Sequence, residues 1–277
     1  MKKPNIFNFL KFSFAAIFVL LSLTSCSDSG IEPMIDKVLA GEHRKPSNVN
    51  RDEFRHPKET LLFFGISPEQ SVVEITPGFG WYAEILAPLL HDKGQYYYTS
   101  YNLHKDINPF FIKMEKKFKE KMKLNPNIYK KLRWVHFKSN QPDFAPDGPV
   151  DMVLTFRNVH NWAKAGTAES MFAGFNKALK PGGVLGLIEH RAKPATPIDQ
   201  QIKSGYMTVE YVVKLAEKNG FRLEASSEIN ANPNDSSDHP GGVWNLLPNL
   251  RDITDENKEV MLQIGESDRM TLKFIKE

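Results

Sequence analysis

The chain has 277 residues, of which 41% are hydrophobic and 25% are charged, and its formal net charge is +3. This apolar content is enough to bury a full core in one large domain or two small ones. A charge so near neutrality gives no reason to expect a nucleic-acid partner. Cys26 is the only cysteine, which excludes a disulfide within the chain.

Residues 1–25 have the features of a lipoprotein signal peptide. Three lysines lie in the first eleven residues, and residues 12–23 are apolar but too short for a comfortable membrane span of about 20 residues. This stretch ends in Leu23-Thr24-Ser25-Cys26, which resembles the bacterial lipobox. We therefore predict a lipid anchor on Cys26. The alternative is a plain secretory segment in which the cysteine is incidental.

A lipid on Cys26 would place the protein in the cell envelope, on the periplasmic face of a membrane. The next residue is Ser27, not aspartate, which slightly favours the outer membrane. Residues 26–45 are polar and lack an apolar pattern. They are predicted to form a flexible tether that spans roughly 25 Å. The folded domain is then expected over residues 46–277.

The first predicted elements of the domain are a helix, a strand and a second helix. Residues 58–64 indicate a helix that Gly65 ends in the left-handed conformation. Residues 71–90 read S-V-V-E-I-T-P-G-F-G-W-Y-A-E-I-L-A-P-L-L. Val72, Val73 and Ile75 form a short apolar run typical of a strand buried on both faces. A tight turn follows, and residues 81–90 have helical spacing.

Strands and helices continue to alternate toward the C-terminus, which predicts an α/β, Rossmann-like, doubly wound and mostly parallel sheet. The further strands are residues 95–101, 132–137, 149–156, 184–189, 221–229 and 268–276, and the further helices are 107–124, 169–179 and 208–219. In helix 107–124 one apolar stripe is expected to face inward and the lysines outward. Contact of these lysines with anionic lipid headgroups is the alternative to plain solvation.

The turn after the first strand predicts a nucleotide-type cofactor. Its glycines would let a ligand approach the backbone, and the following helix would offer free N–H groups. Residues 78–83, G-F-G-W-Y-A, fit the dinucleotide fingerprint G-x-G-x-x-G/A. An NAD(P)-binding oxidoreductase would also need an acid after the second strand, where Asn102 stands. That alternative is therefore poorly supported.

The chain resembles the class I S-adenosylmethionine-dependent methyltransferases, and more narrowly the bacterial "predicted methyltransferase" proteins. The L-K-P-G-G turn of residues 179–183 is characteristic of methyltransferases. The other matching stretches are R-D-E-F-R-H-P at 51–57, E-I-T-P-G-F-G-W-Y at 74–82, T-F-R-N-V-H-N-W at 155–162 and N-P-N-D at 232–235.

This resemblance implies a seven-stranded sheet whose last strand is antiparallel, with S-adenosylmethionine over the C-terminal ends of its strands. Glu74 would lie by the methionine portion of the cofactor, and Gly78 and Gly80 would leave room for the sulfonium and the ribose. Asn102 occupies the usual position of the ribose acid, and Asn140 the region of adenine contacts. Trp81 and Tyr82 of the matched turn are further candidates for cofactor binding.

The segment after the fourth strand carries the candidate catalytic residues. His160 could accept a proton from the methyl acceptor, and Arg157 could hold an acidic substrate or fix Glu74. Asn158 could bond the amine of the cofactor, and Trp162 could wall the site. The alternative is a polar loop with its own internal hydrogen bonds. Residues 189–191, Glu-His-Arg, form either a functional edge or a structural salt-bridge cluster.

We predict no metal site, because Asp235, Asp238 and His239 lack ligand spacing. Their loop, residues 232–248, could be a lid over the pocket. The main hypothesis is an envelope-tethered methyltransferase acting on a small molecule or an envelope component. S-adenosylmethionine is made in the cytosol, so export leaves open a second hypothesis. That alternative is a non-catalytic lipoprotein binding module that reuses the cofactor cleft.

Overall fold

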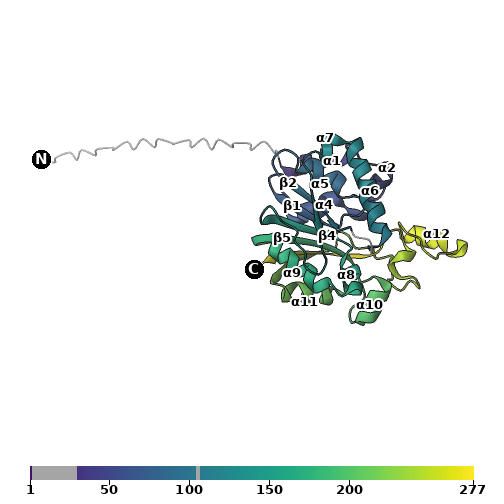
Figure 1. Cartoon of the computed structure of the whole chain (residues 1–277). Coiled ribbons are helices and arrows are strands. Elements are labelled where there is room, and N and C mark those ends of the chain that lie inside the picture. Colours follow the sequence, from purple (N-terminus) through teal and green to yellow (C-terminus); the bar gives the residue numbers. More distant parts are fainter. Residues whose placement is uncertain (2–29, 104–106) are drawn as a thin grey trace.

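A computed structural model describes residues 1, 30–103 and 107–277 (Figure 1). The predicted signal peptide and the lipidation site Cys26 lie outside these described residues. No helix in the described part of the chain combines the length and the apolar character that a membrane-spanning helix requires.

Seven strands form one sheet in the order β3-β2-β1-β4-β5-β7-β6. β1 to β5 pair in parallel, whereas β7 runs antiparallel to both of its neighbours. This confirms the predicted fold class, including the antiparallel last strand. The strands are β1 Ser71–Ile75, β2 Gln95–Tyr101, β3 Arg133–Phe137, β4 Val150–Phe156, β5 Leu179–His190, β6 Phe221–Ser227 and β7 Arg269–Lys276.

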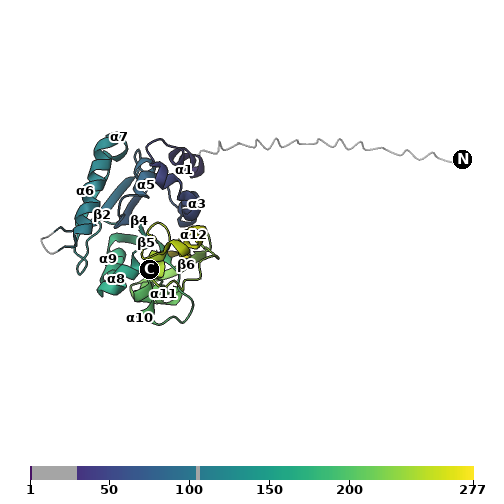
Figure 2. The same ribbon diagram turned by 90° about the vertical axis from the view of Figure 1, so that its right-hand side faces the viewer.

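Helices cover both faces of the sheet, because successive strand residues point to opposite sides and both sides are apolar. Val73 and Ile75 enter one core and Val72 the other. Figures 1 and 2 show the two helical layers. On one face lie α1 Ile31–Leu39, α4 Pro57–Phe64, α5 Ala83–Leu89, α6 Pro109–Leu124 and α7 Pro126–Tyr129, and on the other α8 Val159–Ala165, α9 Ala168–Ala178 and α11 Val209–Lys218.

Five further helical elements complete the described part of the chain. They are α2 Pro46–Val49, α3 Asp52–Arg55, α10 Ile198–Ser204, the 3-10 turn η1 Gly242–Asn245 and α12 Asp255–Ile264. The predicted helices and strands agree with the structure to within two residues at most ends. The main exception is β5, which begins at Leu179, so the L-K-P-G-G turn is part of the strand, with a register shift opposite Val150 and Met152.

The predicted flexible tether over residues 26–45 is wrong for residues 31–45. Residues 31–39 form α1, whose Ile35 is fully buried against α4 and α5. Asp36 accepts from Lys58 at 2.7 Å, and Arg44 pairs with both oxygens of Asp52 at 2.5 and 2.8 Å. The folded domain therefore begins near residue 31 and not at residue 46.

Helix α6 also corrects the prediction that its lysines all face outward. Lys121 is buried, and its ammonium donates to Glu84 at 2.7 Å and to the carbonyl of Phe79 at 3.0 Å. Burial is tolerated because the charge is paired and its donors are used. At the other end of the helix Phe110 is 52% exposed. The apolar stripe is thus exposed at Phe110 and fully buried at Phe118, which stacks on Tyr98 of β2 with ring centroids 4.1 Å apart.

Candidate active site

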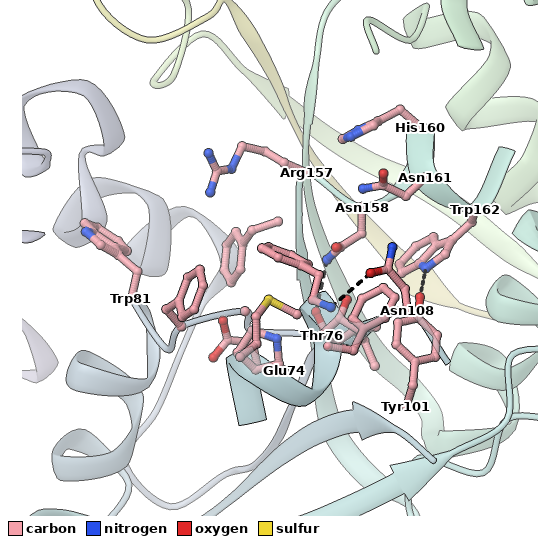
Figure 3. Close-up of a pocket in the computed structure, with 18 of the residues that line it drawn as sticks. Glu74, Thr76, Trp81, Tyr101, Asn108, Arg157, Asn158, His160, Asn161 and Trp162 are labelled. Carbon is pink, nitrogen blue, oxygen red and sulfur yellow. Dashed lines mark hydrogen bonds between the residues drawn. The ribbon is translucent and has the colours of Figure 1, made fainter. Parts of the chain in front are cut away.

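A cavity of about 1530 Å³ opens at the C-terminal edge of the parallel strands (Figure 3). Ligand sites of open α/β sheets lie at this edge, where loops from neighbouring strands converge. The turns after β1 and β4 form its floor, α6 forms one wall, and residues of the 232–248 loop reach its rim. This volume exceeds the usual range for a small-molecule site, so there is room for a cofactor and a second substrate.

The turn after β1 holds an unusual backbone conformation. Thr76 has φ 45° and Gly78 has φ 66°, and a β-branched residue at positive φ is a genuine outlier. The hydroxyl of Tyr98 donates to the carbonyl of Gly78 at 2.7 Å, which holds the turn in place. A Cβ on Gly78 would meet nothing closer than the sulfur of Met114 at 3.8 Å. Gly78 therefore leaves open space at the cavity wall.

Gly80 has a different role from the predicted one. It does not line the cavity, and a Cβ added to it would lie 2.3 Å from the ring of Phe118. Its φ of 74° also favours glycine. Gly80 is therefore required for the packing of α6 on the turn and not to make room for a cofactor.

Glu74 lies in the cavity wall, and it is buried, with 2% of the residue exposed. Burial raises its pKa to about 8, although a hydrogen bond from the Tyr96 hydroxyl at 2.5 Å and the charge of Lys121 act in the opposite direction. A carboxyl with this pKa is largely protonated at neutral pH in the absence of a cation. An ammonium group in the cavity would favour its ionised form.

Aromatic and amide side chains complete this part of the cavity wall. Trp81 donates to the carbonyl of Asn48 at 3.0 Å, and Tyr82 stacks on Phe156 with ring centroids 3.7 Å apart. Asn102 and Asn140 follow β2 and β3, and both line the cavity, with Asn140 exposed at the rim.

The segment after β4 begins with a second strained residue, Arg157 at φ 61°. Its N–H donates to the carbonyl of Ile188 at 2.7 Å. The amide nitrogen of Asn158 donates to the Ile75 carbonyl at 3.0 Å, which ties the ends of β1 and β4 together. From Val159 onward the segment is helix α8, so only Arg157 and Asn158 lie in a loop between the strand and the helix.

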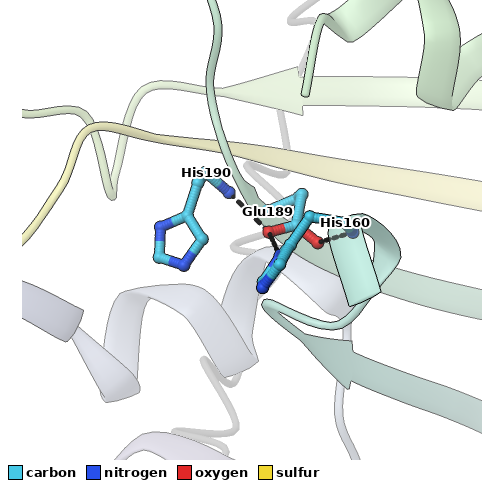
Figure 4. A group of neighbouring side chains, drawn as sticks. All are labelled: His160, Glu189 and His190. Atoms are coloured by element: carbon cyan, nitrogen blue, oxygen red, sulfur yellow. Dashed lines mark hydrogen bonds and ion pairs between the residues drawn. The ribbon is translucent and has the colours of Figure 1, made fainter. Parts of the chain in front are cut away.

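His160 and Glu189 form a buried pair in this wall (Figure 4). His160 Nδ1 lies 3.0 Å from Glu189 Oε1. The backbone N–H groups of His160 and His190 also donate to Glu189, at 3.2 and 2.8 Å. With Glu189 as acceptor, Nδ1 carries the proton and Nε2 keeps its lone pair, while His160 itself lines the cavity. This is the arrangement of a general base with an orienting carboxylate.

His190 lies next to this pair, and its hydrogen-bond partner is a hydroxyl group. Its Nδ1 lies 2.5 Å from the hydroxyl of Ser267. Burial is the main cause that holds the pKa of His190 well below its ordinary value, and the charge of Arg157 acts in the same direction, so His190 is neutral at pH 7. His160, Glu189 and His190 offer ligand atoms within 4.8 Å of one another, as a metal site would. The oxygens of Glu189 already accept three N–H groups, and the absence of a resident metal stays a prediction.

The 232–248 loop contributes an apolar edge to the cavity. Val243, Trp244, Leu247 and Pro248 line it. Asp235 is occupied by structural bonds, since it accepts from Tyr206 at 2.9 Å, from the Asp268 N–H at 2.8 Å and lies 2.8 Å from His239.

The fold therefore gathers most of the predicted site residues in one cavity. Those that line it are Glu74, Gly78, Trp81, Tyr82, Asn102, Asn140, Arg157, Asn158 and His160. Sequence reasoning missed Thr76, whose hydroxyl is buried without a partner among the described residues. The role of Glu189 was also left undecided, because its position at the end of a predicted strand was the only indication of function in the sequence.

Solved structures with the same fold are methyltransferases. An S-adenosylmethionine-dependent methyltransferase from Aquifex aeolicus is 16% identical, with a TM-score of 0.54 over 89% of this chain and 98% of that one. A protein from Galdieria sulphuraria assigned as a sarcosine dimethylglycine methyltransferase is 13% identical, with a TM-score of 0.55 over 84% and 90%. The glycopeptide N-methyltransferase MtfA in complex with S-adenosylmethionine is 14% identical, with a TM-score of 0.50 over 80% and 93%.

The fold is that of the class I methyltransferases. No protein-family model and no curated protein matches the sequence significantly. At these identities the likeness establishes architecture, and function has to be argued from the site.

Proposed function

We propose that this chain is an S-adenosylmethionine-dependent methyltransferase that acts on a small molecule or an envelope component. The observation that carries the proposal is the content of the cavity. One hollow contains an open glycine turn, a buried acid with a raised pKa and a histidine oriented by a carboxylate. These are a ligand cradle, a partner for an ammonium group and a base, which methyl transfer to a protonated acceptor needs together.

The residues of the wall fit S-adenosylmethionine. Gly78 leaves space beside the turn, and the orphaned hydroxyl of Thr76 offers a hydrogen bond there. Glu74 suits the amino group of the methionine portion, and no described residue hydrogen-bonds to Asn158 Oδ1, which could accept from the same group. Asn102 can bond a ribose hydroxyl, less strongly than a charged acid would.

When bound, S-adenosylmethionine supplies an electrophilic methyl group. His160 Nε2 takes the proton from the acceptor atom, and Glu189 keeps the ring in the tautomer that allows this. The stacked rings of Tyr82 and Phe156 and the buried Trp162 keep water from the wall of the cavity. Orientation of the acceptor supplies much of the remaining rate.

Calorimetric titration of the full chain in detergent with S-adenosylhomocysteine tests this proposal. Binding is expected, and no detectable heat at millimolar ligand would refute it. Binding of NAD(P) in its place would favour the oxidoreductase. Binding of S-adenosylhomocysteine without methyl transfer to any of a panel of acceptors would favour the non-catalytic module.

We also propose that Cys26 carries a lipid and holds the domain at the periplasmic face of the envelope, with the outer membrane slightly favoured. The basic start, the apolar run and the lipobox-like quartet support this. Because α1 begins at Ile31, residues 27–30 separate it from the anchor and reach at most about 14 Å. The domain would therefore rest against the membrane. If Cys26→Ser leaves the protein lipid-modified in membrane fractions, this assignment is wrong.

A further inference from the structure

Arginine side chains from three parts of the chain gather beside the cavity around one buried glutamate. Glu266 is 2% exposed and accepts from Arg51 Nε at 2.6 Å and from Arg55 Nε at 3.1 Å. Arg269 of β7 pairs through Nη1 with Glu266 Oε2 at 3.0 Å, the oxygen that Arg55 also contacts. Arg157, from the turn after β4, is near enough to act on the charge of Glu266 but is not one of its ion-pair partners.

The charges in this arginine cluster, Arg51, Arg55, Arg157 and Arg269, do not balance. Three guanidinium groups pair with Glu266, while Arg157 has no ion-pair partner among the described residues and feels the charges of Glu266 and Glu189 only at longer range. Arg44 and Asp52, by contrast, form a balanced ion pair. The two terminal nitrogens of Arg44 donate to the two oxygens of Asp52 at 2.5 and 2.8 Å. Buried charges in proteins are normally paired, because an unpaired charge loses its hydration and gains no ion pair or hydrogen bond to compensate.

The cluster also has unused hydrogen-bond donors. Nη2 of Arg51 and Nη2 of Arg55 are buried and have no partner among the described residues. Both residues line the cavity. Arg157 lines it too (Figure 3). Arg55 is held rigidly, 4.6 Å above the Trp81 ring and bonded to Glu266. The free donors are thus fixed in position before any ligand arrives.

The positive charge persists at neutral pH. Burial, then the charges of the neighbouring arginines, lower the pKa of Arg55, and burial brings that of Arg157 to about 10. Burial would raise the pKa of Glu266, but Arg55 and the other arginines outweigh it and bring it to about 2. Arg157 and Glu266 therefore both remain ionised at pH 7.

We propose that Arg51, Arg55 and Arg157 form an anion-binding subsite that holds a carboxylate or phosphate group of the methyl acceptor. Guanidinium groups match these planar or tetrahedral oxyanions with paired N–H donors. As a statement about the acceptor, this rests on the proposed methyltransferase function. It makes the acceptor an acidic compound.

The sheet order separates the anion from the predicted ribose and adenine positions, which leaves the acceptor or the methionine carboxylate of the cofactor as its source. Asn102 and Asn140 follow β2 and β3, on one side of β1. Arg157 follows β4, and Glu266 and Arg269 belong to the entry of β7, on the other side. Arg157 also lies three residues before His160, so an anion bound there is placed on the side of the base.

The experiment is calorimetric titration of the full chain in detergent with inorganic phosphate at constant ionic strength. The wild type is expected to bind, and Arg157→Gln to bind about tenfold more weakly or worse, the loss of one charge-assisted contact. Arg157→Lys should recover part of the affinity. Arg222→Gln is the matched control, since it removes an exposed arginine of β6 that pairs with Glu224. Arg51→Gln serves as the second variant if Arg157→Gln fails to fold.

Phosphate binding that is absent in the wild type, or equal in Arg157→Gln and the wild type, overturns the subsite. Titration with S-adenosylhomocysteine and methylthioadenosine, which lacks the amino-acid portion, identifies the source of the anion. Unchanged S-adenosylhomocysteine affinity in Arg157→Gln supports the acceptor. Loss of that affinity with methylthioadenosine binding retained assigns the anion to the cofactor and overturns the acceptor assignment. Wild-type protein that binds phosphate but neither nucleoside supports the subsite and refutes the methyltransferase.

Discussion

Glu74 is the residue whose charge is most sensitive to what occupies the cavity. Its folded-state pKa is about 8, against an ordinary value of 4.5. Between these two values the folded carboxyl is protonated and the unfolded one is ionised. The folded state then holds the extra proton, so the contribution of Glu74 to stability falls as pH rises through this window.

Replacing Glu74 with Gln should remove this pH dependence. The amide keeps an acceptor for Tyr96 but cannot ionise, so the variant should gain stability relative to the wild type above pH 8 and little at pH 5. The expected difference is on the order of a few kcal/mol. Urea denaturation at pH 5 and pH 9 measures it, with the exposed Glu69→Gln as control. An equal difference at both pH values would contradict the raised pKa.

The role of Glu189 can be tested without knowing the acceptor. Selective ¹⁵N labelling of histidine reports the tautomer of each ring, and His160→Gln assigns the signal. In the wild type we expect the proton on Nδ1 of His160, because Glu189 accepts there. In Glu189→Gln the amide can also donate, so the Nδ1-protonated form should lose its dominance. A purely structural Glu189 would change the melting temperature and leave the His160 tautomer as it was.

At the scale of elements, the turn between β1 and α5 combines a ligand-facing glycine with a packing glycine. Gly78 and Gly80 have φ of 66° and 74°, so alanine at either incurs a similar backbone cost of about 1–2 kcal/mol. They differ in what the new methyl meets. At Gly78 it projects toward the cavity, and at Gly80 it collides with Phe118.

Gly78→Ala is therefore expected to keep the fold and weaken S-adenosylhomocysteine binding, and a larger side chain should abolish it. Gly80→Ala should lose about 1–3 kcal/mol more stability, because the packing of α6 has to change. Denaturant melts and ligand titrations of both variants measure the contrast. Adding Phe118→Leu should partly rescue Gly80→Ala and not Gly78→Ala. Equal stability losses in the two variants would refute the division of roles.

Strands and long helices were predictable because their pattern is local and strong. The run Val72-Val73 in β1 and the tyrosines of β2 predict strands from local sequence alone. Helices α1 and α8 were missed because each is short and mixes polar with apolar residues. α1 is helical in context, since Ile35 is buried only by docking on α4 and α5.

The site was predictable where it follows strand ends and not where it depends on distant pairing. Glu74, Asn102 and Arg157 could be placed because parallel strands bring their C-terminal ends to one edge. The arginine cluster could not, since Arg51 and Glu266 are 215 positions apart and a single sequence gives no sign of their contact. Gly80 was misassigned because a fingerprint glycine does not reveal whether it faces a ligand or a side chain.

At the scale of the whole molecule, α1 determines at which residue the domain begins and how close the domain would lie to a membrane. A mobile tether would let the cavity face any direction. A docked α1 instead fixes residues 31–39 against α4 and α5, on the face that also carries α6 (Figure 2). The orientation of the domain on a lipid anchor would then be restricted by the short segment before residue 31.

Ile35→Ala tests whether α1 is part of the domain in solution. Ile35 is fully buried, so truncation should cost about 2–5 kcal/mol of unfolding free energy, the usual range for a core isoleucine. Met34 lies one position earlier and is 41% exposed, which makes Met34→Ala a control with nearly the same effect on helix propensity. Guanidinium denaturation of both variants measures the difference. A tether that only visits the domain surface would give two small and equal losses, and the folded domain would then begin after α1.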